Sequence, residues 1–445
     1  MIVRPLGWLG ILRLGLVQTA LGAIVVMTTS TLNRVMVIEY ALPATIPGLL
    51  VGLHYAVQVL RPRWGYGSDQ GGRHVPWILG GMGVLAAGGF GAALSTVLLS
   101  SSAMAGLCLA ALSYLMIGAG VGAAGTNLLV LLAKRVVPER RGPAAMLVWV
   151  MMIVGFIVTT AIAGHNLDPF SPGRLLVVSG TISVVALLIA GAALMGIETS
   201  ADITRARLAN DNPREAGEGA FLEALRAVWN EPQSRRFTIF VFVSMLAYSS
   251  QDLILEPFAG IVFTLTPGQT TKLSSVQHGG VLAGMVLVAL LVNPVTKGRF
   301  GSLRTWTIAG CIASAAALAL LSLGGLVGAG WPLRTTVFAL GVANGAYAVA
   351  AIGSMMGMVS DGGAGKGGTR MGLWGAAQAI AFGLGGLAGS TASDIARALL
   401  GAPMPAYALV FALESVLFLV SAVLAAGLSQ AREPVRPRSV SVPAE

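Results

Sequence analysis

The chain has 445 residues, of which 55% are hydrophobic and only 10% are charged, and its formal net charge is +10. Soluble domains carry about 25% charged residues, so this composition excludes an ordinary soluble enzyme, a disordered protein and a secreted disulfide scaffold. The two cysteines, Cys108 and Cys311, lie in separate apolar runs with no second cysteine nearby. We therefore expect no disulfide and no metal site.

Apolar segments long enough to cross a membrane recur along the chain, since a helix needs about 20 such residues to do so. We predict twelve of them, at residues 12–35, 43–60, 75–99, 103–133, 143–166, 174–198, 237–265, 273–295, 302–327, 331–359, 370–396 and 405–428. The expected fold class is an all-α polytopic membrane protein with twelve transmembrane helices.

The basic residues predict the orientation of these helices. If the N-terminus is cytoplasmic, 23 of the 28 Lys and Arg residues fall in cytoplasmic segments and five on the other side. Such an asymmetry is typical of cytoplasmic loops. We therefore expect both termini in the cytoplasm, an even number of spans, and no nucleic-acid partner for the net positive charge.

The longest polar stretch divides the apolar segments into two groups of six. We expect an N-terminal six-helix bundle at 1–198, a cytoplasmic linker at 199–236, a C-terminal six-helix bundle at 237–428 and a disordered tail at 429–445. Residues 219–229 place apolar side chains on one helical face. This short amphipathic helix either lies along the membrane interface or packs on the neighbouring loops.

Ionisable and polar side chains inside membrane helices are candidates for function. Arg34 and Glu39, near the end of the first segment, either pair as a gate or reach the interface separately. Asp252 and Glu256 follow Gln251 and are four residues apart, so they share a helical face. Three roles stay open for them: helix contact, ion or proton coupling, and contact with a pigment or ligand.

The apolar segments also contain histidine, glutamine and asparagine side chains. His54 and Gln58 share a face of the second segment, His165 ends the fifth and His278 begins the eighth. Asn127 and Asn344 lie among glycines, where we expect hydrogen bonds between helices. No P-loop, HExxH or GxSxG motif occurs, and we expect no enzymatic activity.

Several motifs resemble those of a known family. The loop after the second segment reads GxxxDxxGRH, with Gly65, Asp69, Gly72 and Arg73, and resembles the loop signature of the major facilitator superfamily. The strings at 31–39 and 251–257 resemble the bacteriochlorophyll delivery branch (PucC/LhaA-type) of that superfamily. The resemblance extends over most of the chain and implies the major-facilitator-type fold with two pseudo-symmetric halves.

The resemblance also implies a role in phototrophic bacteria. Such proteins help to assemble light-harvesting antenna complexes in the inner (intracytoplasmic) membrane, by holding or delivering bacteriochlorophyll to antenna polypeptides. Chlorophyll synthase and the membrane insertion machinery are the further partners it implies, and it gives no expectation for a carotenoid. A neutral histidine is a common axial ligand of a tetrapyrrole metal, so His54, Gln58, His165 and His278 are the candidate pigment contacts. His54 is the best placed of them, since it lies in the middle of its segment and in a family motif, and the alternative for it is a hydrogen-bonded core histidine. The alternative to the assembly role is a proton-coupled secondary transporter of a small molecule.

Overall fold

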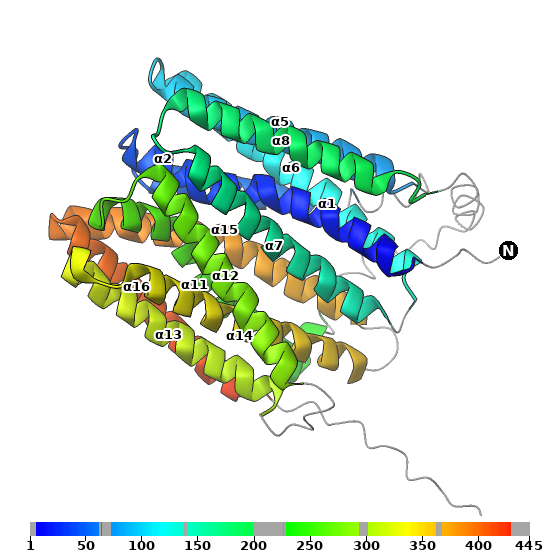
Figure 1. Ribbon diagram of the computed structural model, residues 1–445. Coiled ribbons are helices and arrows are strands. Elements are labelled where there is room, and N and C mark those ends of the chain that lie inside the picture. The colour runs from blue at the N-terminus through cyan, green and yellow to red at the C-terminus, as the bar shows by residue number, and fades with distance from the viewer. Residues whose placement is uncertain are drawn as a thin grey trace, which may run out of the picture.

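The computed structural model is a bundle of α-helices (Figure 1). It describes residues 6–61, 64, 73–137, 140–198, 226, 228–292, 301–361 and 367–428. Gly65, Asp69 and Gly72 of the loop signature, most of the expected amphipathic helix and linker, and the C-terminal tail lie outside the described residues. Arg73 is described and is exposed immediately before a helix.

The helices of the first half follow closely the predicted apolar segments. The first is continuous through α1 (Trp8–Val26), the π-helical turn η1 (Met27–Leu32) and α2 (Asn33–Ile38). The next are α3 (Thr45–Val57), prolonged by the 3₁₀ turn η2 (Gln58–Leu60), α5 (Val75–Leu99), α6 (Ala103–Arg135), α7 (Arg141–Asn166) and α8 (Pro172–Leu194).

The second half begins with α11 (Pro232–Val262) and α12 (Pro267–Leu291). It continues with α13 (Leu303–Val327) and the short turn η4 (Gly328–Gly330), α14 (Leu333–Asp361), α15 (Gly367–Leu400) and α16 (Pro403–Ala426). Ten helices among the described residues are long and apolar enough to cross a membrane, and the chain is a multi-pass membrane protein; α3, with its η2 extension, is a shorter apolar helix and α15 lies outside that group.

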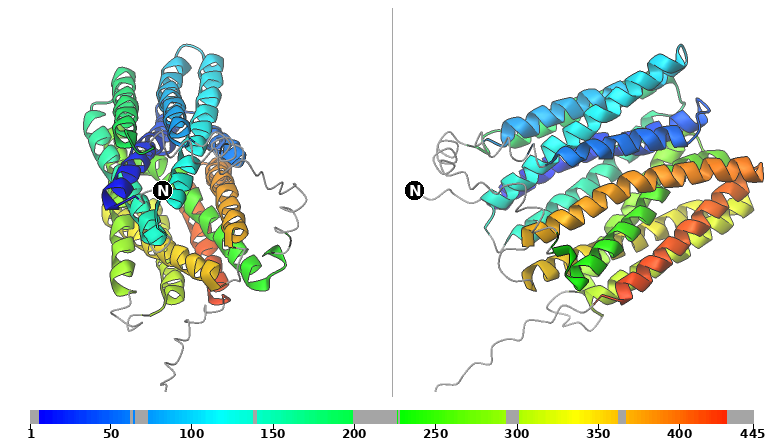
Figure 2. Two further views of the ribbon diagram at one scale, coloured as in Figure 1. Left: turned by 90° about the vertical axis from the view of Figure 1, so that its right-hand side faces the viewer. Right: turned by 180° about the vertical axis from the view of Figure 1, so that it is seen from behind.

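Two large apolar cores lie on either side of the bundle, and a third, smaller one joins α7 to α12 and α14. The first is built by residues between Ile11 and Ile197, joined by Leu253, and the second by residues between Phe237 and Leu428. In Figure 1, α5, α6 and α8 lie on one side of the bundle and α13, α14 and α16 on the other. The two halves meet where α7 packs on α12 and α3 packs on α15 (Figure 2).

Glycines set the close helix packing inside each half, as the glycine-rich runs indicate. On α12, a Cβ added to Gly284 would lie 2.1 Å from the carbonyl oxygen of Val342 on α14. On α14, a Cβ added to Gly345 would lie 2.0 Å from the carbonyl oxygen of Val281. Since no side chain fits at either distance, these two helices touch backbone to backbone.

Candidate functional site

Buried polar side chains gather where the first helix contacts α11 and α12. Ser30 Oγ lies 3.0 Å from Ser274 Oγ, and Thr31 Oγ1 lies 3.0 Å from Thr271 Oγ1. Both first-half hydroxyls belong to η1, and π-helical turns are frequent at functional sites. We call this group the polar interface; its members are Ser30, Thr31, Asn33, Arg34, Glu256, Thr270, Thr271 and Ser274.

A proline explains one bond of the polar interface. Pro257 has no N–H group, so it cannot donate to the carbonyl oxygen of Leu253 four residues earlier. Asn33 Nδ2 donates to that oxygen across the two halves at 2.5 Å. Helix α11 continues through the proline to Val262. The Asn33 side chain therefore takes the place of the missing main-chain donor.

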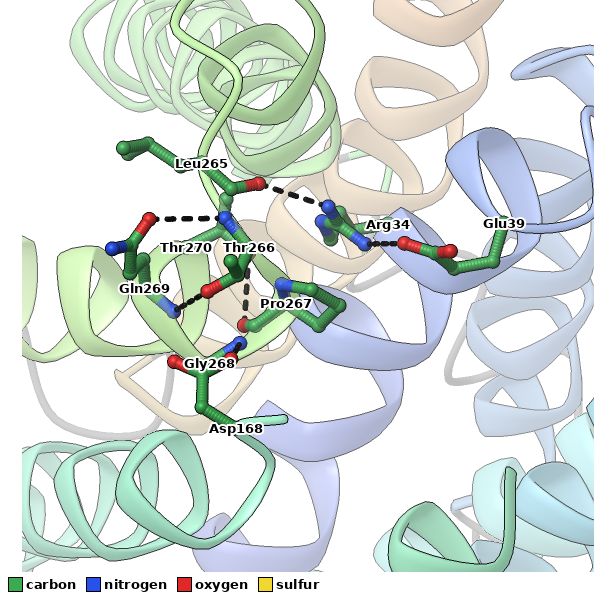
Figure 3. A network of polar contacts seen from close by, with 9 residues as sticks. All are labelled: Arg34, Glu39, Asp168, Leu265, Thr266, Pro267, Gly268, Gln269 and Thr270. Atoms are coloured by element: carbon green, nitrogen blue, oxygen red, sulfur yellow. Dashed lines mark hydrogen bonds and ion pairs between the residues drawn. The ribbon is translucent and has the colours of Figure 1, made fainter. Parts of the chain in front are cut away.

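Arg34 and Glu39 form the ion pair that was one of the two expected alternatives. Arg34 Nη1 lies 2.6 Å from Glu39 Oε1, and its Nη2 donates to the carbonyl oxygen of Leu265 at 3.0 Å (Figure 3). The Arg34 side chain is 3% exposed and that of Glu39 is 31% exposed. Because Leu265 follows α11, the guanidinium joins the two halves at the end of the bundle where α2 lies.

Asp252 and Glu256 share a helical face, as their spacing predicts, and both face α12. Asp252 Oδ1 accepts a hydrogen bond from Gln277 Nε2 at 3.4 Å. The Glu256 carboxylate has Ser30, Thr270 and Arg34 as its neighbours. Among the described residues, neither of its oxygens has a hydrogen-bond partner. Glu256 is thus a buried acidic group next to a buried cation, without a direct contact between them.

Gln251 and Asp252 extend this polar region further along α11. The Gln251 side chain is fully buried, and neither its amide oxygen nor its amide nitrogen has a partner in the described chain. Asp252 is partly exposed and has Tyr55, Tyr248 and Tyr347 in its surroundings. These tyrosines come from α3, α11 and α14, so Asp252 faces the contact between the halves.

Aromatic rings pack beside Asp252. The Tyr55 ring stacks on Phe382 of α15 with centroids 5.5 Å apart, and Tyr248 meets the edge of Phe382 at 6.0 Å. Flat apolar surface and a polar hydroxyl are therefore presented together by three helices from both halves.

His54 is buried at 2% exposure and bonded within its own helix. Arg61 donates to Gln58 Oε1, so the Gln58 amide nitrogen faces His54 Nε2 at 2.9 Å and donates to it. The lone pair of Nε2 is then occupied, and the ring proton sits on Nδ1. His54 and Gln58 do share a face, but His54 in this arrangement offers no free lone pair to a metal.

The other two candidate histidines differ from His54 and from each other. His278 is buried, its Nδ1 donates to the carbonyl oxygen of Ser274 at 2.8 Å, and Phe156 of α7 lies against the ring at 4.9 Å. His165 is exposed at the end of α7. The three histidines lie on different helices, and no cluster of three or more metal-ligating side chains occurs among the described residues.

The two asparagines expected to bond between helices do so. Ser314 Oγ of α13 lies 2.9 Å from Asn344 Oδ1 of α14. Asn127 Oδ1 of α6 lies 3.3 Å from Nδ1 of His74, at the start of α5.

Four acidic residues with structural contacts or deep burial were not singled out from the sequence, and one of them, Glu198, accepts the N–H groups of His74 and Val75 at the start of α5. Glu414 lies in the apolar helix α16, is 2% exposed, and neither of its oxygens has a partner among the described residues. The intramembrane-charge rule that selected Asp252 would have selected it too. Asp168 and Asp394 sit near helix ends, where sequence gives no sign of a distant partner.

Solved structures with the same fold are membrane transporters. A peptide transporter POT superposes with a TM-score of 0.68 and 12% sequence identity, covering 95% of this chain and 96% of that one. The nucleoside transporter NupG superposes with a TM-score of 0.61 and 13% identity, covering 95% and 100%. At this identity the likeness concerns the fold alone, which is of the major facilitator type.

One curated relative corrects an expectation. The "Bacteriochlorophyll synthase 44.5 kDa chain" of Rhodobacter capsulatus is 48% identical over 436 residues, covering 98% of this chain and 99% of that protein. Its name connects a full-length relative with an enzyme, which contradicts the expectation that this chain has no enzymatic role. The absence of soluble-enzyme motifs was too narrow a criterion for a membrane chain of that kind.

The family follows from two further matches. "Protein PucC" of Rhodobacter capsulatus is 29% identical over 438 residues, covering 94% of this chain and 92% of that protein. The family model described as PUCC protein matches residues 31–433. Since this match and the 48% identical relative both extend over most of the sequence, the chain belongs to the PucC protein family.

Proposed function

We propose that the chain is an assembly factor for bacterial light-harvesting antenna complexes, which holds bacteriochlorophyll in the membrane and delivers it to antenna polypeptides. The observation that carries the proposal is the family match over residues 31–433, together with a relative named as a chain of bacteriochlorophyll synthase. The chain would receive pigment from chlorophyll synthase and work beside the membrane insertion machinery. Its location would be the inner (intracytoplasmic) membrane.

The proposed topology has twelve spans, with α3 and α15 crossing the membrane beside the ten longer apolar helices. Both termini would be cytoplasmic, with six-helix halves joined by a linker that is shorter than the expected 199–236, because α11 already begins at Pro232. The two large apolar cores support this division, since one is built by residues up to Ile197 with Leu253 alone added, and the other by residues from Phe237 on. The end of the bundle that carries α2 would then face away from the cytoplasm.

His278 is the histidine best prepared to ligate the magnesium of the pigment. Its Nδ1–H donates to the Ser274 carbonyl oxygen, so the lone pair is on Nε2. This is the arrangement that metal-ligating histidines commonly adopt, because the second hydrogen bond fixes the tautomer and the ring orientation. His54, whose Nε2 accepts from Gln58, would first have to break that bond.

The test is purification of the protein from a phototrophic cell in mild detergent. We expect bacteriochlorophyll absorbance and antenna polypeptides in the same elution peak. Elution of the protein with neither bacteriochlorophyll nor antenna polypeptides would refute the proposal. Polypeptide without pigment would replace pigment delivery with a scaffold that binds antenna polypeptide alone.

A second candidate function is proton-coupled transport of a small molecule. It is favoured by Asp252, a partly exposed carboxyl group at the contact between the halves of a transporter fold. Uptake into vesicles driven by a proton gradient and abolished by Asp252→Asn would support transport. Equal pigment delivery by the wild type and Asp252→Asn, with no uptake, would exclude it.

A further inference from the structure

Two aspartates at the α2 end of the bundle reach from one half to the other. Asp168, in the turn after α7, accepts the main-chain N–H of Gly268 on Oδ1 at 3.2 Å (Figure 3). Gly268 lies in the first turn of α12, whose N-terminus also carries a capping box of Thr266 and Gln269. Asp168 therefore supplies one of the hydrogen bonds that the first turn of a helix cannot make internally.

Asp394 does the same for α3, which begins without a side-chain cap of its own. Its Oδ1 accepts the N–H of Ala44 at 3.0 Å, and its Oδ2 accepts both the N–H of Thr45 at 2.7 Å and the Thr45 hydroxyl at 2.8 Å. Arg397 lies 2.8 Å from Oδ1 and holds the carboxylate in place. A carboxylate at a helix N-terminus is also favoured by the helix dipole.

The two contacts occupy corresponding places in the halves. Within each half, counting α1 to α2 as one helix, α3 and α12 come second, and α7 and α15 come fifth. Each aspartate comes four residues after a small residue that contacts the capped helix: Gly164 precedes Asp168, and Ser390 precedes Asp394. A Cβ added to Gly164 would lie 2.6 Å from the Gly268 carbonyl oxygen, and one added to Gly48 would lie 2.8 Å from Ser390 Cβ.

We propose that Asp168 and Asp394 are an equivalent pair of helix-capping residues that hold the two halves together at the α2 end of the bundle. Each carboxylate connects the fifth helix of one half to the start of the second helix of the other half. The Arg34–Leu265 contact lies at the same end. Separation of the halves at this end requires both carboxylates to release their N–H groups. The inference concerns closure of the fold and goes beyond the pigment function proposed above.

The test measures how readily the polar interface opens. Ser274→Cys, in a Cys108→Ala/Cys311→Ala background, places a thiol at the buried position that contacts Ser30. The purified protein in detergent is labelled with a water-soluble maleimide. We expect Asp168→Ala and Asp394→Ala each to raise the labelling rate about tenfold, as loss of a helix N-cap implies. The double variant should raise it by about the product of the two factors.

Two controls keep the experiment decisive. Asp168→Asn retains the Oδ1 acceptor and should label at the parental rate. A second reporter, Leu318→Cys, lies in the apolar core of the second half and should stay unreactive in every variant. Unchanged labelling at position 274, an equal rise at both reporters, or labelling of Asp168→Asn as fast as Asp168→Ala would each overturn the proposal.

Discussion

The Asn33–Leu253 hydrogen bond should matter only because Pro257 is present. Asn33→Leu removes the donor and leaves the Leu253 carbonyl oxygen buried without a partner. An unsatisfied buried group costs about 1–3 kcal/mol in proteins, whereas measured hydrogen bonds between membrane helices average about 0.6 kcal/mol and reach at most about 1.7 kcal/mol. Since Leu253 is buried and has no alternative donor on its own helix, we expect a cost of ~1.5 kcal/mol, near the upper end of the membrane values.

A double-mutant cycle isolates this bond. Pro257→Ala restores a main-chain N–H at position 257, which can donate to the Leu253 oxygen within α11. In that background Asn33→Leu should cost only ~0.5 kcal/mol, so the coupling energy should be about 1 kcal/mol. The free energy of unfolding would be measured by circular dichroism while SDS is added to mixed micelles.

A matched control is available on α14. Asn344 is also a buried asparagine with a bond between helices, but its partner is Ser314, far along the chain from Pro257. Asn344→Leu should therefore cost the same with and without Pro257→Ala. Equal costs of Asn33→Leu in the two backgrounds, within about 0.3 kcal/mol, would refute the proposed replacement of the missing donor.

Three further substitutions test the remaining polar groups. Arg34→Gln breaks a largely buried ion pair with Glu39 and should lower the free energy of unfolding by ~2–3 kcal/mol in the same SDS titration, and a loss below ~1 kcal/mol would contradict a stabilising pair. His278→Leu should remove most co-purified bacteriochlorophyll absorbance, whereas His54→Leu should retain it; the reverse pattern would favour the second span as the ligand site. Glu414→Met removes an acidic group without a hydrogen-bond partner from an apolar core and should raise the unfolding free energy by ~1–3 kcal/mol, while a decrease would reveal a partner formed in another state.

The fold was predictable because it depends on local composition. Runs of apolar residues such as 75–99 and 103–133 correspond to helices Val75–Leu99 and Ala103–Arg135, since a membrane helix must be apolar along its own length. The shared face of Asp252 and Glu256 was predictable for the same reason, because a spacing of four is a property of one helix. The π-helical turn η1 left no recognisable sign in the sequence.

The contacts of the candidate site were less predictable because they join distant parts of the chain. The donor to Leu253 is Asn33, more than 200 positions away, and the cap of α3 is Asp394, about 350 positions away. Neither residue lies in a local pattern that names its partner. The expectation that the chain has no enzymatic role failed for a different reason. The motifs sought describe soluble active sites, whereas the 48% identical relative is named as a 44.5 kDa chain of bacteriochlorophyll synthase.

The distribution of contacts separates rigid from movable parts of the molecule. Inside the second half, α12 and α14 touch backbone to backbone at Gly284 and Gly345. Such a close-packed contact has no room for water or for a different side-chain rotamer. Between the halves, an apolar cluster that includes Ile153 and Val281 is joined by hydroxyl pairs such as Ser30–Ser274 and by the carboxylate caps of Asp168 and Asp394. These polar groups can exchange their partners for water at modest cost. We therefore expect each half to move as a unit, with the hydrogen bonds of the polar interface and of the two caps breaking as the halves separate.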